Sequence, residues 1–418
     1  MLCFDTLITF APFSEGSFSL IQRVNFLTNH NHAKNFMNTI QLTRKLISIP
    51  SYVKGKNNEK KIGDFAFRFL KAIPYLEVQK QEIGDGRFNI IAQTKGRPRL
   101  LLAGHLDTVE PKQGWFRNQF QGNIENSRLY GLGSLDTKAG IAAILSSLAG
   151  LTKVSGLTLL FYCDEEYDFQ GMKQFIKRNK RRTPWELAVI VEPTDLKIWN
   201  AQRGIIEISF SVQGKSGHAA NPSSGKNAID GVASAISELR IWLEKFQDKV
   251  LGIPTLNLAY MRGGLNQCVN AKGQVVLGKA GNNIADFAEA TIDIRPTKAT
   301  LKAKDVIKQL NIALAKQGVR LLGYSIRHDF GVLRTDPREL KTLEKVLKEK
   351  CGKAEYLSAK NSGYGDGQLL AEKLMVPVVY IGPKGSNAHG PNEWVDTRSI
   401  EKLKSIFNAL IKIYCTRG

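Results

Sequence analysis

The sequence predicts an α/β fold with a mainly parallel sheet, into which a smaller α+β domain is inserted. Helical and extended segments alternate from residue 37 to about residue 202, a pattern typical of helices on both faces of a parallel sheet. From residue 205 apolar residues alternate at a period of two, and helix and strand alternate again after residue 329. A chain of 418 residues also exceeds what one hydrophobic core usually supports, so two domains are expected.

The first part of the larger domain is predicted from apolar spacing and from short apolar runs bounded by turn residues. The predicted elements are helices at 37–50 and 59–72, strands at 88–93 and 100–104, a helix at 138–150, a strand at 157–162, a helix at 171–179 and a strand at 187–191. Residues 1–36 show no clean helical or strand period. We therefore expect an N-terminal extension over 1–36 and a functional domain that starts near Met37.

The inserted domain is predicted from the order of its elements. They are a strand at 205–212, a helix at 228–246, strands at 255–260 and 288–295, a helix at 302–317 and a strand at 319–327. This β-α-β-β-α-β order is the split ferredoxin-like arrangement. A helix at 337–350, a strand at 376–381 and a helix at 400–414 follow. The expected boundaries are 37–203 and 329–418 for the two parts of the larger domain and 204–328 for the inserted one.

Charge and cysteine content limit the partners and the compartment. The net charge of +21 invites a nucleic-acid interpretation, especially at the basic run 173–182. The lysines are nevertheless spread along the chain and no aromatic-rich module interleaves them, so a solvated helix face, a general lysine bias or attraction of anionic substrates explains the charge better. No apolar run of about eighteen residues predicts a membrane span. The five cysteines are scattered without a Cys-x-x-Cys pair, which favours a cytoplasmic protein. From the spread of the lysines and the absence of a long apolar run, we expect neither a nucleic-acid nor a membrane partner.

Five candidate metal ligands lie along the chain, each behind a short apolar run bounded by Gly or turn residues. They are His105, Asp136, Glu166, Glu192 and His389. Alone, each such residue is more often a solvated surface group. In an open parallel sheet, however, ligands collect at the carboxyl ends of the strands. Two metal ions need about five protein ligands, one of them a bridging carboxylate, and a neighbouring base. The joint pattern therefore predicts a site for two zinc ions.

Seven motifs link this pattern to a known family. They lie at 104–109, 130–138, 164–166, 191–194, 214–218, 293–296 and 388–393. On these motifs the chain resembles the di-zinc metallohydrolase family of acetylornithine deacetylase, succinyl-diaminopimelate desuccinylase, aminoacylase and glutamate carboxypeptidase. The resemblance extends from Met37 to the C-terminus. It implies a zinc-hydrolase catalytic domain with an inserted lid and dimerisation domain.

The resemblance also implies how the metal ions are held. It places His105 and Glu192 on one Zn²⁺, Glu166 and His389 on the other, and Asp136 as the bridge between them. Each subunit would thus hold two Zn²⁺, for which Co²⁺ or Mn²⁺ can substitute.

Two further catalytic roles are expected beside these ligands. The resemblance implies that Glu165 is the general base that takes a proton from a metal-activated water. Asp107 lies two residues after His105, on the same face of an extended segment, so its carboxylate is expected to accept a hydrogen bond from the imidazole and fix its tautomer. The resemblance also implies a cis peptide bond between Asp136 and Thr137.

Substrate contacts are expected from the inserted domain and from one late loop. The resemblance implies that Arg203, Asn283 and Arg295 bind the substrate carboxylate, for which the bidentate guanidinium is well shaped. On residue type alone, Arg203 could instead be an ion-pair partner and Arg295 a strand-end charge. The loop 362–367 is expected to line the leaving-group side through Gly363 and Asp366. Its Tyr364 departs from the loops of both the desuccinylases and the carboxypeptidases.

His218 follows the first strand of the inserted domain. On composition alone it is a solvent-exposed loop histidine. The resemblance implies instead that it enters the active site of a partner subunit and supports the tetrahedral oxyanion there. A homodimer formed through the lid domain is therefore expected.

The activity implied is zinc-dependent hydrolysis of the amide bond of an N-acyl amino acid in amino-acid biosynthesis. The expected substrate is a small N-acyl amino acid or a dipeptide. The nearest alternative is a dipeptidase or carboxypeptidase of the same family, because the metal ligands do not separate these activities. A non-catalytic relative is a further alternative, but it would lack a ligand or the base, and every expected residue is present.

Overall fold

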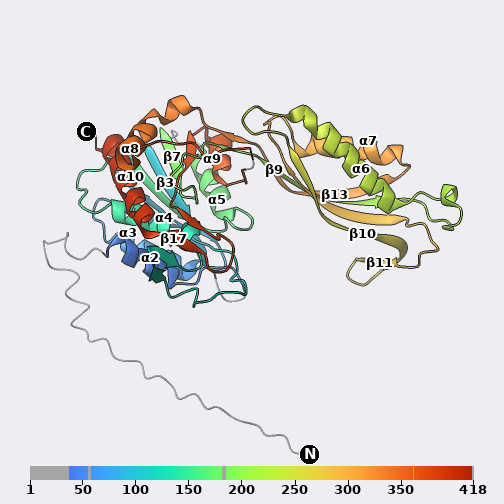
Figure 1. Ribbon diagram of the computed structural model, residues 1–418, viewed down its shortest axis with the longest axis horizontal. Helices are drawn as coiled ribbons and strands as arrows, with labels where there is room; N and C mark the ends of the chain where they lie inside the picture. Colours follow the sequence, from blue (N-terminus) through green and yellow to red (C-terminus); the bar gives the residue numbers. More distant parts are fainter. Residues whose placement is uncertain (1–36, 55–57, 181–184, 361, 417–418) are drawn as a thin grey trace, which may run out of the picture.

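The computed structural model describes residues 37–54, 58–180, 185–360 and 362–416, which form two lobes (Figure 1). The predicted extension at 1–36 lies outside the described residues. Within the described part of the chain, no helix is both long enough and apolar enough to cross a lipid bilayer.

The larger lobe is built on a six-stranded sheet. Its strands are β1 (Glu77–Gly84), β2 (Arg87–Gln93), β3 (Leu100–His105), β6 (Leu157–Tyr162), β7 (Leu187–Ile190) and β15 (Val378–Tyr380). Their order is β1-β2-β6-β3-β7-β15, and the last four are mutually parallel. β3 and β6 are buried at every position, as their unbroken apolar runs require in a sheet covered on both faces. The predicted mainly parallel sheet is confirmed.

Helices cover both faces of this sheet. They are α2 (Thr39–Ile47), α3 (Lys60–Lys71), α4 (Ala139–Ser147), α5 (Gln170–Asn179), α8 (Lys341–Cys351), α9 (Gly367–Leu374) and α10 (Thr397–Cys415). The helices α2, α3, α4, α8 and α10 share one apolar cluster, while α5 and α9 share a second one against the opposite face. In α10 the side chains of Leu403, Phe407 and Leu410 recur at helical spacing and are buried.

The smaller lobe is a five-stranded antiparallel sheet with two helices. Its elements are β9 (Ile205–Gln213), α6 (Ala228–Leu243), β10 (Thr255–Val269), β11 (Val275–Gly278), β12 (Phe287–Arg295), α7 (Ala303–Lys316) and β13 (Arg320–Phe330). The strand order is β11-β10-β12-β9-β13, and both helices pack on one face in a single apolar cluster. The predicted β-α-β-β-α-β order is confirmed, with β11 as an additional edge strand that pairs with β10.

Two small sheets connect the parts that form the site. The strands β8 (Ala201–Gln202) and β14 (Leu333–Arg334) pair where the chain enters and leaves the smaller lobe. A second sheet, in the order β16-β17-β5-β4, joins β4 (Asn123–Glu125) and β5 (Arg128–Tyr130) to β16 (Gly385–Ser386) and β17 (Trp394–Asp396). This sheet brings the last quarter of the chain beside the segment that precedes α4.

Short helical turns connect some of these elements. They are η1 (Ser134–Lys138), η2 (Pro222–Ser224), η3 (Glu244–Phe246) and η4 (Pro337–Leu340). Apolar spacing did not predict β1, α9, β11, the β8–β14 pair or the sheet of β4, β5, β16 and β17. These elements are short or largely polar, so their formation depends on distant partners.

Candidate metal centre

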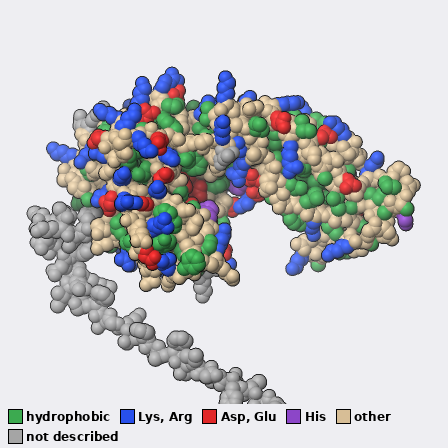
Figure 2. Space-filling view, viewed as in Figure 1, with side chains coloured by type: hydrophobic (Ala, Val, Ile, Leu, Met, Phe, Trp, Pro, Cys, Tyr) green, Lys and Arg blue, Asp and Glu red, His purple; other side chains and the backbone are tan. Residues whose placement is uncertain are grey.

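The five predicted metal ligands meet at the carboxyl edge of the parallel strands. His105 is the last residue of β3, Glu192 follows β7, and Glu166 follows β6. Asp136 lies in the η1 turn before α4, and His389 lies between β16 and β17. Figure 2 shows acidic and histidine side chains in the hollow between the two lobes. Strand direction and the small sheet together explain why residues so far apart in sequence converge here.

The side chains form two groups that share Asp136. On one side, His105 Nε2 lies 2.9 Å from Asp136 Oδ1 and 3.7 Å from Glu192 Oε1. On the other, His389 Nε2 lies 3.2 Å from Asp136 Oδ2 and 3.0 Å from Glu166 Oε1. Ligand atoms of His105, Asp136 and Glu166 all lie within 4.8 Å of one another. Each oxygen of Asp136 thus faces one histidine, which is the arrangement that a bridging carboxylate needs.

The electrostatics of the centre favour bound cations. Burial, followed by repulsion from Glu192, raises the pKa of Glu165 well above its usual value. Burial and the neighbouring Asp136 do the same to the pKa of Glu192. Hydrogen bonds with Asp136 and Glu166 raise the pKa of His389 to about 10. Several buried carboxylates beside imidazoles repel one another unless positive charge joins them, and this nitrogen and oxygen donor set suits Zn²⁺ and similar divalent ions.

Asp107 holds the two adjacent glutamates by their backbone. Its carboxylate accepts hydrogen bonds from the Glu165 amide at 3.2 Å and the Glu166 amide at 2.9 Å. His105 Nδ1 lies 3.0 Å from the carbonyl oxygen of Asp107, whereas the nearest carboxylate oxygen is 3.6 Å away. The expected bond from His105 to the Asp107 carboxylate is therefore replaced by one to the Asp107 carbonyl, while the carboxylate accepts from the two amides. Either acceptor keeps the proton on Nδ1 and turns Nε2 toward the metal site.

Glu393 supports Asp136 and was missed by the sequence reasoning. Its side chain is 1% exposed and accepts hydrogen bonds from the amides of Gly133 at 2.7 Å, Leu135 at 2.7 Å and Asp136 at 3.0 Å. It thereby fixes the backbone on the N-terminal side of the bridging carboxylate. The peptide bond between Asp136 and Thr137 is cis, as expected. The only sequence signal for Glu393 was its place in the 388–393 motif.

His218 and Asn283 lie together on the smaller lobe. Their backbones form an isolated antiparallel bridge, and both residues are exposed. The only hydrogen bond of the His218 imidazole within the described residues is accepted by Nδ1 from the Ala220 amide at 3.1 Å. The structure therefore brings these two predicted residues together at one exposed site on the smaller lobe.

Arg203 and Arg295 differ in how their charges are paired. Arg203 is 7% exposed, and its Nε donates to the Leu251 carbonyl at 3.0 Å. No carboxylate of the described residues pairs with this guanidinium, and burial lowers its pKa. Arg295 Nε instead contacts Asp293 Oδ1 at 2.8 Å. A buried arginine without an acidic partner is well placed to receive an anionic ligand group, so Arg203 is the stronger candidate of the two.

The late loop divides into an open and a buried part. Gly363 is exposed, and a Cβ atom added there would meet nothing within 4 Å. Asp366 is 1% exposed, its Oδ1 accepts from the Tyr162 hydroxyl at 2.9 Å, and burial raises its pKa to about 7. The ring of Tyr364 stacks on Phe330 with centroids 5.5 Å apart. Gly363 is thus accessible to a substrate, whereas Asp366 contacts the strand end beneath the metal centre.

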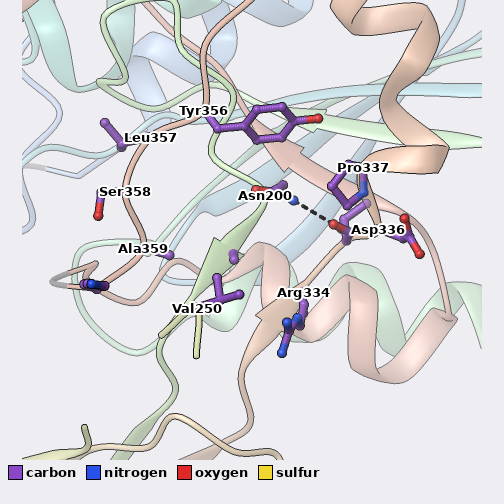
Figure 3. Close-up of a pocket in the computed structure, with 12 residues that line it drawn as sticks. Asn200, Val250, Arg334, Asp336, Pro337, Tyr356, Leu357, Ser358 and Ala359 are labelled. Carbon is purple, nitrogen blue, oxygen red and sulfur yellow. Dashed lines mark hydrogen bonds between the residues drawn. The ribbon is translucent and has the colours of Figure 1, made fainter. Parts of the chain in front are cut away.

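A separate cavity of about 760 Å³ lies beside the β8–β14 junction (Figure 3). Its lining includes Asn200, Val250, Arg334 and Tyr356 and none of the predicted metal ligands. It is therefore distinct from the candidate metal centre.

Comparison with known proteins identifies relatives over most of the chain. It is 29% identical over 402 residues to the acetylornithine deacetylase of Pectobacterium carotovorum, covering 90% of this chain and 97% of that protein. The acetylornithine deacetylase of Buchnera aphidicola is 28% identical over 401 residues, with 90% and 98% covered.

Solved structures show the same fold. An M20-family metallo-carboxypeptidase from Sulfolobus solfataricus superposes with a TM-score of 0.71 at 17% identity, covering 91% of this chain and 99% of that one. A dinuclear metal-binding peptidase of the M20 family from Bacillus subtilis has a TM-score of 0.63 at 15% identity, with 90% and 97% covered.

The family model of peptidase family M20/M25/M40 matches residues 101–413. This range contains all five predicted metal ligands and both glutamates after β6. The resemblance stated from the motifs and the class of metal-dependent hydrolase that it implies are confirmed. The chain belongs to peptidase family M20/M25/M40.

Proposed function

We propose that this protein is a zinc-dependent amidohydrolase that removes the acyl group from an N-acyl amino acid, as an acetylornithine deacetylase does. One observation carries this proposal: the two oxygens of Asp136 face two different histidines. Oδ1 lies 2.9 Å from His105 and Oδ2 lies 3.2 Å from His389. The relatives named acetylornithine deacetylase, 28–29% identical over 90% of the chain, support the substrate class. When bound, two divalent ions supply an activated water and positive charge beside the scissile carbonyl.

Glu165 and Glu166 divide the acid–base and ligand roles. Glu166 Oε1 lies 3.0 Å from His389, within the ligand group. No hydrogen bond or ion pair engages the Glu165 carboxylate within the described residues, while its backbone amide is held by Asp107. Glu165 is therefore free to take a proton and to deliver it to the leaving amine, which is the work of a general base and then a general acid.

The substrate assay separates this function from its alternative. We expect the Zn²⁺- and Co²⁺-loaded enzyme to hydrolyse N-acetylornithine or N-succinyl-diaminopimelate with a higher kcat/KM than it shows for dipeptides. The measurement is amine release across that panel, with chelator-treated protein as the control. Preference for a dipeptide would support the peptidase alternative, and no turnover of any substrate by metal-loaded protein would refute the hydrolase proposal.

Arg203→Lys tests the carboxylate contact. Lysine keeps the charge but loses the planar fork, so we expect KM to rise roughly tenfold while kcat changes little, as for an interaction equal in ground and transition states. Steady-state kinetics give the split. Arg334→Lys is a matched control, because Arg334 already pairs with Asp248 at 3.1 Å on the surface. An unchanged KM in Arg203→Lys would remove Arg203 from substrate binding.

We further propose a cytoplasmic homodimer in which residues 204–328 are the lid and dimerisation domain. The exposed pair of His218 and Asn283 supports a role toward a second subunit. Cys163, Cys268, Cys351 and Cys415 are free, which supports a reducing compartment.

Subunit mixing tests the role of His218 in the partner. His218→Ala and Glu165→Ala homodimers are both expected to be inactive. Heterodimers formed from the two should recover partial activity, because one of their two sites has an intact base and receives an intact histidine from the partner. A mixture of Glu165→Ala with Asp136→Ala is the control that must not recover, since both changes disable the subunit's own site. Absence of recovery in the first mixture would argue against a role in trans.

A further inference from the structure

A buried ion network lies directly behind the loop that carries Glu165 and Glu166. Arg87, the first residue of β2, donates from Nε to Glu59 Oε2 at 2.8 Å and from Nη2 to Glu59 Oε1 at 2.7 Å. The same Nη2 donates to Asp164 Oδ1 at 2.6 Å. The side chains of Arg87, Glu59 and Asp164 are 13%, 0% and 6% exposed. Three charged groups are thus shielded from water immediately beside the predicted base.

Asp164 links this network to the acidic loop, residues 163–169. Its amide donates to Glu59 Oε1 at 3.1 Å. Its second carboxylate oxygen accepts hydrogen bonds from the amides of Asp168 at 3.3 Å and Gln170 at 3.2 Å. Asp164 has a φ of 70°, a conformation that needs such support in a residue other than glycine. The loop therefore takes its shape from contacts made by Asp164, the residue before the two glutamates.

Asn89 provides a second anchor from the same strand. It lies two residues after Arg87, so both side chains leave the same face of β2. Asn89 Oδ1 accepts from the Cys163 amide at 3.2 Å, and its Nδ2 donates to the Gly171 carbonyl at 2.8 Å. A Cβ atom at Gly171 would lie 2.3 Å from the Cys163 carbonyl oxygen, so only glycine permits this close approach. Asn89 thus holds together the two ends of the segment that contains the acidic loop.

The contacts of Arg87 and Glu59 lie on the opposite side of the acidic loop from those of Asp107. The Asp107 carboxylate holds the amides of Glu165 and Glu166 from the side of β3, and Arg87 and Glu59 hold Asp164 from the side of β2. Hydrogen bonds on both sides leave the loop little freedom to shift either carboxylate. A planar guanidinium with several fixed donors can contact two carboxylates at once, whereas an ammonium group cannot reproduce that geometry.

We propose that Arg87, acting with Glu59, is a positioning residue that sets the distance between the Glu165 base and the metal ions. This inference rests on the proposed function. Arg87 touches neither substrate nor metal ligands and acts through Asp164. Loss of its forked guanidinium should displace Glu165 and Glu166 together. We therefore expect kcat and the affinity of one metal site to fall, while the affinity for substrate is retained.

The test compares Arg87→Met with Arg87→Lys. We expect Arg87→Met to lower kcat roughly 10–100-fold and to weaken one of the two metal sites by a similar factor, the usual effect of removing an outer-sphere partner. KM should stay within about twofold, because the substrate contacts are intact. Arg87→Lys keeps the charge without the fork and should restore only part of the loss. Kinetics and titration of Zn²⁺ against a competing chromophoric chelator provide the two readouts.

Arg99→Met is the matched control. Arg99 Nε contacts Glu186 Oε1 at 2.9 Å, also as part of a two-bond pair, but at the opposite end of the same sheet, before β3 and β7. This variant should keep wild-type kcat and both metal affinities. If Arg99→Met produced the same losses as Arg87→Met, the effect would be a general one on stability, and the positioning role would be refuted.

A paired substitution covers the case in which Arg87→Met leaves Glu59 unpaired and fails to fold. Glu59→Gln combined with Arg87→Gln removes both charges of this pair and leaves Asp164 as the one remaining charge of the network. The Asp164 carboxylate still accepts hydrogen bonds from the Asp168 and Gln170 amides, so this variant should fold. This double variant should show the same loss in kcat and the same loss of Zn²⁺ affinity at one metal site. Any folded Arg87 variant with wild-type kcat and two wild-type metal affinities would overturn the inference. Zn²⁺ titration needs no substrate, so wild-type protein that binds no metal would instead overturn the proposed function.

Discussion

Glu165→Ala is expected to keep both metal ions and to lose at least about two orders of magnitude in kcat, the usual scale of general-base catalysis. The carboxylate of Glu165 has no hydrogen-bond or ion-pair partner among the described residues, so its removal leaves the ligand group of Asp136 and Glu166 in place. The measurement combines steady-state kinetics with metal analysis of the purified protein. Retained metal with lost turnover would assign Glu165 to proton transfer.

Two further variants make this result specific. Glu165→Gln preserves shape and volume but cannot accept a proton, so it should be as inactive as Glu165→Ala. Glu186→Ala, at the amino end of the strands, should be fully active. Wild-type kcat in Glu165→Gln would exclude Glu165 as the base.

Asp136→Ala is expected to have the second large effect, through loss of metal. Both oxygens of Asp136 face histidines, so its removal would take a ligand from each of the two proposed ions and leave the remaining acids to repel one another. We expect affinity for at least one ion to fall more than about a hundredfold, beyond the usual cost of losing an outer-sphere partner. Activity should fall with it.

Metal analysis and a Zn²⁺ titration check this expectation. Asp195→Ala is a suitable control, because Asp195 is a half-exposed acid that follows the same edge of the sheet. Excess Zn²⁺ should restore little activity to Asp136→Ala. Two ions bound with wild-type affinity in that variant would contradict a bridging role for Asp136.

The central strands could be predicted because their signals are local, whereas the candidate metal ligands were predicted from their joint pattern along the chain and from the family resemblance. The run Leu100–His105 is apolar enough to be buried on both faces, and the strand ends at a histidine. The edge strand Glu77–Gly84 has mainly polar residues and only two buried positions, so no apolar alternation identified it. Its existence depends on pairing with β2 across a tight turn.

Glu393 and Glu59, which support the site from behind, could not be predicted because their partners lie far away in the sequence. Glu393 accepts from the Gly133 amide 260 positions away, and Glu59 pairs with Arg87 across 28 positions. In the sequence Glu59 is a single charged residue, indistinguishable from those that face solvent, and the only signal for Glu393 was its place in the 388–393 motif. The hydrogen-bond partner of His105 could not be predicted either, because both the carbonyl and the carboxylate of Asp107 lie near the ring and only the folded backbone decides which is nearer.

The small sheet that joins β5 to β17 has a consequence for biosynthesis of the protein. It delivers His389 to a site whose other ligands precede the whole inserted lobe in sequence. During translation, the early ligands emerge long before the histidine that completes their set. The proposed ion site of His105, Glu192 and Asp136 is then already complete in sequence, whereas the proposed site of Glu166 and His389 would fill only when nearly the full polypeptide has left the ribosome. Fragments that end before His389 should therefore bind one ion fewer than the full chain.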